Sequence, residues 1–193
     1  MAKRSATHME AQRERIMRAA IACIADKGLD RTSVADIRRK ADVSTGTLYV
    51  HFKSKDDLIS AALSYASFRE GTAPETWRET LEILTSLDGQ LGFDIKTVAR
   101  TRLHLHAECA LPGHMHDTFR PILQNILDFT SQQLEKFEAR GEIRMRMSPA
   151  QTARALVGVV DGLLMIALET DRPLEDLRVD LVTAIDCMIE TRS

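Results

Sequence analysis

Residues 32–58 constrain the fold of this chain more than any other segment, because they read as two short helices joined by a tight turn. Apolar residues at helical spacing, preceded by a capping hydroxyl at Thr32 or Ser33, predict a first helix of about two turns that ends near Asp42. A short polar side chain such as that of Asp42 tolerates the left-handed backbone of a turn. Ser44 is then placed to begin the second helix.

The second helix is expected to bury Leu48 and to present a small, uncharged front edge. Gly46 lies in that edge, although glycine costs roughly 1 kcal/mol in a helix interior, so a close approach to another backbone is indicated. The start of such a helix favours a phosphate through its free N–H groups and its dipole. Ser54, followed by Asp57, has the spacing of a capping box for the next helix.

Residues 32–58 resemble the DNA-binding domain of TetR-family transcriptional regulators. The positions that carry the resemblance are Thr32, Ile37, Ala41, Val43, Ser44, Thr45, Gly46, Thr47, Leu48, Tyr49, His51, Phe52, Lys55 and Leu58. Asp42 stands where the family usually has glycine, and Arg38 stands where it usually has alanine. The resemblance implies a homodimer on a palindromic double-stranded operator. It implies DNA contacts from Thr32, Ser44, Thr45, Gly46, Thr47, Tyr49, His51 and Lys55.

The composition favours an all-α chain, because aromatic residues make up only 5% and strong helix formers are plentiful. Apolar residues at helical spacing, separated by Gly and Pro breaks, predict about nine helices along the chain. No strands are expected. A three-helix DNA-binding domain is predicted for residues 1–53, and a helical effector-binding and dimerisation domain for residues 54–193, with a helix at 54–70 linking the two. The capping-box signature of Thr7 and Glu10 predicts where the first helix starts.

Charge and cysteine content suit a cytoplasmic DNA-binding protein. Residues 1–60 hold twelve Lys and Arg against eight Asp and Glu, whereas the remainder holds fourteen against twenty. The three cysteines show no Cys-x-x-Cys spacing, so neither a disulfide framework nor a thiolate metal site is expected. The N-terminal residues do not read as a signal peptide, and the apolar stretch 155–168 is too short to span a bilayer. We expect no cofactor and no membrane partner.

Two apolar helices in the last third of the chain predict a homodimer. Ser148 and Gln151 form a capping box for the first of these helices, which is apolar almost all round. In the resembled family the last two helices pair with their copies across a two-fold axis, and burial within one chain is the alternative. The expected interface residues are Leu156, Gly158, Val160, Gly162, Leu177, Leu181 and Ile185.

An effector site is expected inside the C-terminal helical bundle. Few polar residues fall there, so an apolar or aromatic small molecule held by one or two polar contacts is predicted. The candidate residues are Trp77, Phe93, Arg102, His106, Phe119 and Met165. Residues of these types also occur as plain core residues, which is the competing interpretation.

Four histidines crowd one short stretch: His104, His106, His114 and His116. A metal or acid–base site is the hypothesis they raise. Histidines two positions apart point to different faces of a helix, and the last two are expected in a loop after Pro112 and Gly113. No metal site is predicted, because no three ligands are fixed together.

Three functions compete on the sequence alone. The leading hypothesis is a homodimeric, ligand-responsive regulator, a repressor released from DNA by its effector. The second is a DNA-binding protein without a small-molecule effector, controlled by a protein partner or acting architecturally. The third is an enzyme that uses the histidine stretch, and no nucleophile–base pair or phosphate loop supports it.

Overall fold

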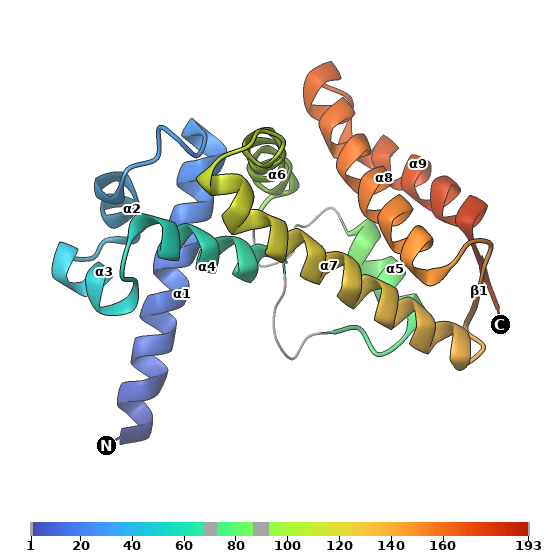
Figure 1. The fold of residues 1–193 in the computed structure, drawn as a ribbon, viewed down its shortest axis with the longest axis horizontal. Coiled ribbons are helices and arrows are strands. Elements are labelled where there is room, and N and C mark those ends of the chain that lie inside the picture. The colour runs from blue at the N-terminus through green and yellow to red at the C-terminus, as the bar shows by residue number, and fades with distance from the viewer. Residues whose placement is uncertain (1, 68–72, 87–92, 193) are drawn as a thin grey trace. The chain divides into compact units, whose positions relative to one another are not determined.

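The computed structural model describes residues 2–67, 73–86 and 93–192, and these residues form nine helices and two short strands (Figure 1). The all-α expectation is thus confirmed. The elements are α1 (Ala2–Lys27), α2 (Val34–Ala41), α3 (Thr45–His51), α4 (Lys55–Ser67), α5 (Trp77–Thr85), α6 (Ile95–Cys109), α7 (His114–Ala139), β1 (Ile143–Met145), α8 (Pro149–Thr170), α9 (Leu174–Met188) and β2 (Ile189–Thr191).

The chain divides into two compact units. The first holds Met1–Phe68 with Arg100–Thr118, and the second holds Arg69–Ala99 with Phe119–Ser193. Helices α6 and α7 therefore contribute residues to both units. The boundary expected between residues 53 and 54 falls inside the first unit, because α4 packs against α1. Of the linking helix expected at 54–70, the part after Ser67 lies outside the described residues.

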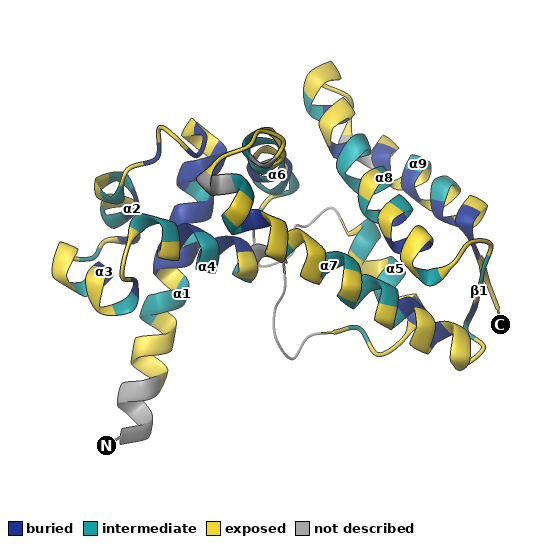
Figure 2. Cartoon of the chain, in the orientation of Figure 1, coloured by how far each residue is buried: buried dark blue, intermediate teal, exposed yellow. Residues whose placement is uncertain are grey.

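The first unit is built on α1, whose buried residues gather in its second half, where α2 and α4 pack against it (Figure 2). Ile16, Ala20, Cys23 and Ile24 form its buried stripe and are all 4% exposed or less. The Tyr65 hydroxyl of α4 donates a hydrogen bond to Glu14 Oε1 of α1 at 2.5 Å. Helix α2 of the α2–α3 motif is therefore held by α1, against which α4 also packs.

Helix α1 starts earlier than predicted. It begins at Ala2, so Thr7 lies inside the helix and does not cap it. Lys3 and Arg4 belong to the better helix formers, and their propensity competes with the local capping signal. Helix α7 likewise begins at His114, which puts His114 and His116 in its first turn and not in the expected loop.

The second unit has its core between α5, the end of α7, α8 and α9. Trp77 is 1% exposed and lies with its ring 6.1 Å from that of Phe137. The indole N–H of Trp77 donates to Thr191 Oγ1 at 3.1 Å, and its backbone N–H donates to Glu142 Oε2 at 2.7 Å. The start of α5 is thus fixed to both the β1 end and the C-terminal end of the unit. As predicted, Ser148 and Gln151 cap α8 reciprocally.

A two-stranded antiparallel sheet corrects the expectation that strands are absent. β1 pairs with β2, and Ile143 stands opposite Thr191. Each strand is only three residues long, so no composition signal announces it. The pair forms because Ile143 and Ile189 are each 1% exposed in the core, and pairing then satisfies the backbone groups of two buried segments.

Candidate nucleic-acid interface

The turn between α2 and α3 has the backbone that the sequence predicts at Asp42. Its φ of 51° and ψ of 56° lie in the left-handed region, and its N–H donates to the carbonyls of Arg38 and Arg39. The N–H of Val43 also donates to the Arg38 carbonyl, at 3.2 Å. Aspartate visits this region more readily than most residues, so it can replace the glycine usual at such a turn.

Ser44 begins α3 as its N-cap. The Ser44 Oγ accepts the Thr47 N–H at 3.0 Å and lies 2.8 Å from Thr47 Oγ1. Ser44 therefore has a defined local task in starting the helix, and the Thr47 hydroxyl is held in one orientation by the same contact.

The leading edge of α3 is formed by Thr45 and Gly46, which are both exposed. A Cβ added at Gly46 would meet only Ser44 Oγ, at 3.8 Å, and Gly46 is not among the glycines with positive φ. Nothing in the described chain therefore requires glycine here. Because glycine lowers helix stability by roughly 1 kcal/mol relative to alanine, its presence points to a partner outside the chain.

The rear of α3 is anchored to the core. Leu48 and Phe52 are 0% and 1% exposed, and the guanidinium of Arg13 lies 4.7 Å from the centre of the Phe52 ring. His51 Nε2 lies 3.0 Å from Gln12 Oε1 of α1. These contacts fix the end of α3 to α1 and so set the direction in which the front edge points.

His51 acts in this anchoring as a neutral group. Burial lowers the pKa of His51, the positive charge of Arg13 lowers it further, and Glu10 raises it. A lowered pKa favours the neutral imidazole at pH 7. His51 is therefore placed to hydrogen-bond Gln12, and the contact with DNA expected of His51 stays a prediction.

Tyr49 and Lys55 flank the exposed side of α3. Tyr49 is 51% exposed, whereas Lys55 is half-buried with its Nζ donating to the Leu29 carbonyl at 3.4 Å. Val50, which the sequence analysis did not select, is 68% exposed. An exposed apolar side chain on such a helix can contact a thymine methyl group. Its position directly after the outward-facing Tyr49 was the signal that could have identified it.

Thr32 is the predicted DNA-contact residue whose side chain the structure places inside the protein. It is 1% exposed, and its Oγ1 donates to the Gly28 carbonyl at 2.7 Å. Gly28 has a φ of 82°, so the Thr32 hydroxyl closes the glycine turn that ends α1. The Thr32 hydroxyl is thus used within the chain, and the expected contact between Thr32 and DNA stays a prediction.

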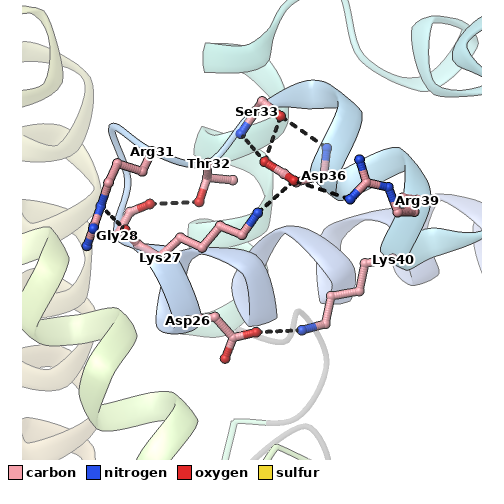
Figure 3. Close-up of polar contacts among 9 residues, drawn as sticks. All are labelled: Asp26, Lys27, Gly28, Arg31, Thr32, Ser33, Asp36, Arg39 and Lys40. Carbon is pink, nitrogen blue, oxygen red and sulfur yellow. Dashed lines mark hydrogen bonds and ion pairs between the residues drawn. The ribbon is translucent and has the colours of Figure 1, made fainter.

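A polar cluster holds the start of α2 against the end of α1 (Figure 3). Ser33 Oγ accepts the Asp36 N–H at 3.1 Å, and Asp36 Oδ1 lies 2.7 Å from Lys27 Nζ. The hydrogen bond from Lys27, followed by those from Ser33, holds the pKa of Asp36 well below its usual range. A second pair, Lys40 and Asp26 at 2.8 Å, joins the same two helices.

The six predicted effector residues do not gather in one described pocket. Arg102 and His106 belong to the first unit. The other four belong to the second unit: Trp77, Phe93, Phe119 and Met165. Trp77 and Phe119 are core residues at 1% and 4% exposure, whereas Met165 is 41% exposed. A small pocket in the second unit is lined by none of the six. The effector site therefore stays a prediction.

The histidine stretch forms no metal site among residues 2–67, 73–86 and 93–192, where no group of three or more potential ligands comes together. His104 has a packing role in the first unit. A Cβ added at Gly28 would lie 3.2 Å from His104 Cε1, so the imidazole ring covers the glycine that ends α1.

Four of the seven residues expected at a dimer interface are used inside the chain. Leu156, Leu177, Leu181 and Ile185 are at most 7% exposed. They belong to the core of the second unit. The other three lie nearer the surface, with Gly158 exposed and Val160 and Gly162 half-buried.

A separate apolar face remains exposed on α8 and α9. It consists of Met165, Ile166, Val179 and Val182, which are 41%, 47%, 67% and 37% exposed. Gly158 and Gly162 precede Met165 and Ile166 at helical spacing, so these four share one side of α8. We call these six residues the α8–α9 face.

Among the described helices, α8 alone is long and apolar enough to cross a membrane by length and composition, a test that core helices of soluble proteins also pass. Only 28% of its most apolar window is buried within the chain. Ala155, Val159, Val160 and Leu163 of this helix pack partly buried against the core, whereas Met165 and Ile166 stay exposed.

A family profile described as "Bacterial regulatory proteins, tetR family" matches residues 16–62. The match covers α2 and α3 with the parts of α1 and α4 that pack on them.

Individual relatives extend the similarity over most of the chain. The A-factor receptor protein of Streptomyces griseus is 30% identical over 167 residues, which are 84% of this chain but only 57% of that protein. The HTH-type transcriptional regulator UidR of Escherichia coli K12 is 27% identical over 164 residues, 82% of each chain. A solved TetR-family transcriptional regulator from Rhodococcus sp. superimposes with a TM-score of 0.77 at 27% identity, covering 92% of this chain and 97% of that one. UidR and the Rhodococcus protein are both described as transcriptional regulators.

Proposed function

Because this chain belongs to the tetR family of bacterial regulatory proteins, we propose that it is a homodimeric repressor that binds a palindromic operator and releases it when a small effector binds. It acts on double-stranded DNA in the cytoplasm. The helix-turn-helix of α2 and α3 is the part that enters the DNA groove.

The observation that carries this proposal is the front of α3. Gly46 stands in a helix where the chain leaves room for a Cβ, next to the exposed Thr45. A small, uncharged edge of this kind allows a helix to come close to a DNA backbone and base edges. The anchoring of Leu48 and Phe52 supports the same use, because a reading helix must be held rigidly from behind.

The predicted contact residues divide by chemistry. Thr45 and Thr47 carry a hydroxyl and a methyl group suited to base edges, whereas Tyr49 and Lys55 are suited to phosphates. Ser44 acts by starting α3, and its backbone lies at the same edge. Thr32 and His51 support the motif from inside through Gly28 and Gln12.

Homodimerisation is proposed through the α8–α9 face. Its exposed apolar side chains support a second copy as the partner, since a palindromic operator requires two-fold symmetry in the protein. The glycines Gly158 and Gly162 leave open space within the chain and would allow a helix of the partner to approach closely. The half-sites then lie about one helical turn apart or a multiple of it.

Release by an effector requires that the ligand bind the DNA-free conformation more tightly than the DNA-bound one. An apolar or aromatic molecule bound near the six predicted residues is the effector that the sequence favours. The described pocket, at about 50 Å³, is smaller than a drug-sized ligand site, which leaves a regulator without a small-molecule effector as the second candidate.

The test is to capture genomic fragments with the purified full-length protein and to footprint the enriched DNA. The expected result is one inverted repeat protected by a dimer. A protein that retains random fragments without enrichment, at moderate salt, is not a specific regulator. Titrating metabolites related to the neighbouring genes against the bound operator then separates the two candidates, because only the first is released.

A further inference from the structure

A small pocket with an aliphatic floor lies among α5, α6, α8 and α9 in the second unit. The floor is formed by Leu164, Leu177 and Leu181, which are no more than 9% exposed, and half-buried Leu84 and Ile95 form part of the wall. Apolar lining of this kind favours an alkyl group over a sugar or a nucleotide, because it offers no partners for several hydroxyls.

The lining of the pocket includes an arginine that has no partner among the residues the structure describes. Arg178 is exposed and lines the pocket, and it has no ion pair or hydrogen bond within the described part of the chain. Arg172 of the adjoining turn, in contrast, contacts Asp176 at 3.4 Å and Asp180 at 3.0 Å. The exposed Ser86 also lines the pocket. A guanidinium in the lining of an apolar pocket suits a carboxylate, which accepts two parallel hydrogen bonds from arginine.

The size of the pocket limits the length of the ligand. Its volume is about 50 Å³. One water-sized group takes roughly 10 to 15 Å³ on this measure, so on the order of four methylene-sized groups fit.

From these features we propose that the pocket binds short-chain aliphatic carboxylates of about four to six carbons, with the alkyl chain on the leucine floor and the carboxylate at Arg178. The inference rests on the proposed function only in assigning this ligand as the effector. The binding site itself is independent of DNA.

The direct test is calorimetric titration of the full-length protein with sodium hexanoate at constant pH and ionic strength. A ligand of about eight heavy atoms is expected to bind with a Kd on the order of 0.1 to 1 mM. Affinity should rise by up to about fourfold per methylene from acetate to hexanoate and then level off, because the pocket is full. Hexylamine, with the opposite charge, should not bind.

The variant Arg178→Gln should weaken hexanoate binding by about tenfold while leaving the fold intact, because the side chain is exposed. Arg172→Gln is the matched control, since Arg172 is also an exposed arginine of the second unit but does not line the pocket. Any one of three outcomes would overturn the proposal. Hexanoate and hexylamine bind equally well, or hexanoate does not bind at 10 times the expected Kd, roughly 10 mM. The third outcome is an equal loss of hexanoate affinity in both arginine variants.

Operator binding is measured on the same samples without ligand. If the protein binds hexanoate through Arg178 but binds no specific DNA, the proposed site stands and the proposed regulatory function is wrong. If the protein binds its operator but does not bind hexanoate, the proposed function stands and the proposed site is wrong.

Discussion

Lys27 Nζ lies 2.7 Å from Asp36 Oδ1, and this ion pair joins the last turn of α1 to the first turn of α2. The same carboxylate accepts the Ser33 hydroxyl at 2.7 Å and the Ser33 N–H at 3.2 Å. The Asp36 side chain therefore caps the start of α2 and also links α2 to α1.

Asp36→Asn should make the stability of the first unit less dependent on acid. The pKa of Asp36 is lower in the folded than in the unfolded state, so its stabilising effect is complete above the unfolded pKa of about 4 and is lost as the pH falls below it. The variant should be less stable than the parent at pH 7, and the difference should shrink below about pH 4. Thermal unfolding followed from pH 7 to pH 3 measures this.

Asp26→Asn is the matched control for that experiment, because Asp26 also pairs with a lysine but caps no helix. Asp26→Asn should lower the stability at pH 7 by less than Asp36→Asn does. A difference between Asp36→Asn and the parent that stays constant down to pH 3 would contradict the assigned role of the carboxylate.

Gly46→Ala should stabilise the protein and weaken DNA binding. The structure leaves room for the new Cβ at 3.8 Å from Ser44 Oγ, and alanine is favoured over glycine in a helix by up to about 1 kcal/mol. If DNA approaches α3 closely at Gly46, operator affinity should fall at least tenfold. Urea denaturation measures the change in stability, and operator titration measures the change in affinity. An unchanged operator affinity would show that DNA does not approach α3 closely at Gly46.

Lys55→Ala should lower affinity for all DNA sequences alike and reduce the salt dependence. Each lost phosphate contact reduces the slope of log K against log salt by roughly 0.9 for each half-site. Lys96→Ala, an exposed lysine of α6 in the second unit, should leave the slope unchanged. Equal slopes for the parent and Lys55→Ala at several salt concentrations would show that Lys55 does not contact phosphate.

Ile166→Glu should separate the dimer without unfolding the chain. Ile166 is 47% exposed within one chain, so a charge there costs the monomer little but would be buried in the proposed interface. Sedimentation should show a dimeric parent and a monomeric variant at micromolar concentration. Leu111→Glu, at a leucine that is 68% exposed outside the α8–α9 face, should remain dimeric. A monomeric parent would refute the interface.

Thr191→Val should destabilise the second unit by about 1 kcal/mol, because the buried indole N–H of Trp77 loses its acceptor. Trp77 is the sole tryptophan, so its fluorescence reports the transition directly during urea denaturation. Thr183→Val is the control, since that exposed hydroxyl donates only to its own helix, at Val179. Equal stability of the two variants would argue against the Trp77–Thr191 bond.

Local signals in the sequence were sufficient where the deciding contacts span only a few residues. The cap at Ser44, the capping box of Ser148 with Gln151 and the left-handed turn at Asp42 were each predicted and found. In each case the side chain satisfies backbone groups within about four residues, and the geometry of the turn itself selects the residue type. The helix-turn-helix could be recognised for this reason.

Tertiary structure alone decided which side chains are free to act. Thr32 is buried by its bond to Gly28, and four of the predicted interface residues, such as Leu181 and Ile185, are taken by the core of their own chain, which leaves Ile166 and its neighbours exposed. β1 and β2 pair across more than 40 residues of sequence, beyond the reach of any local pattern. Apolar periodicity states that a residue prefers burial, but the partner that buries it is fixed only when distant segments compete for the same surface.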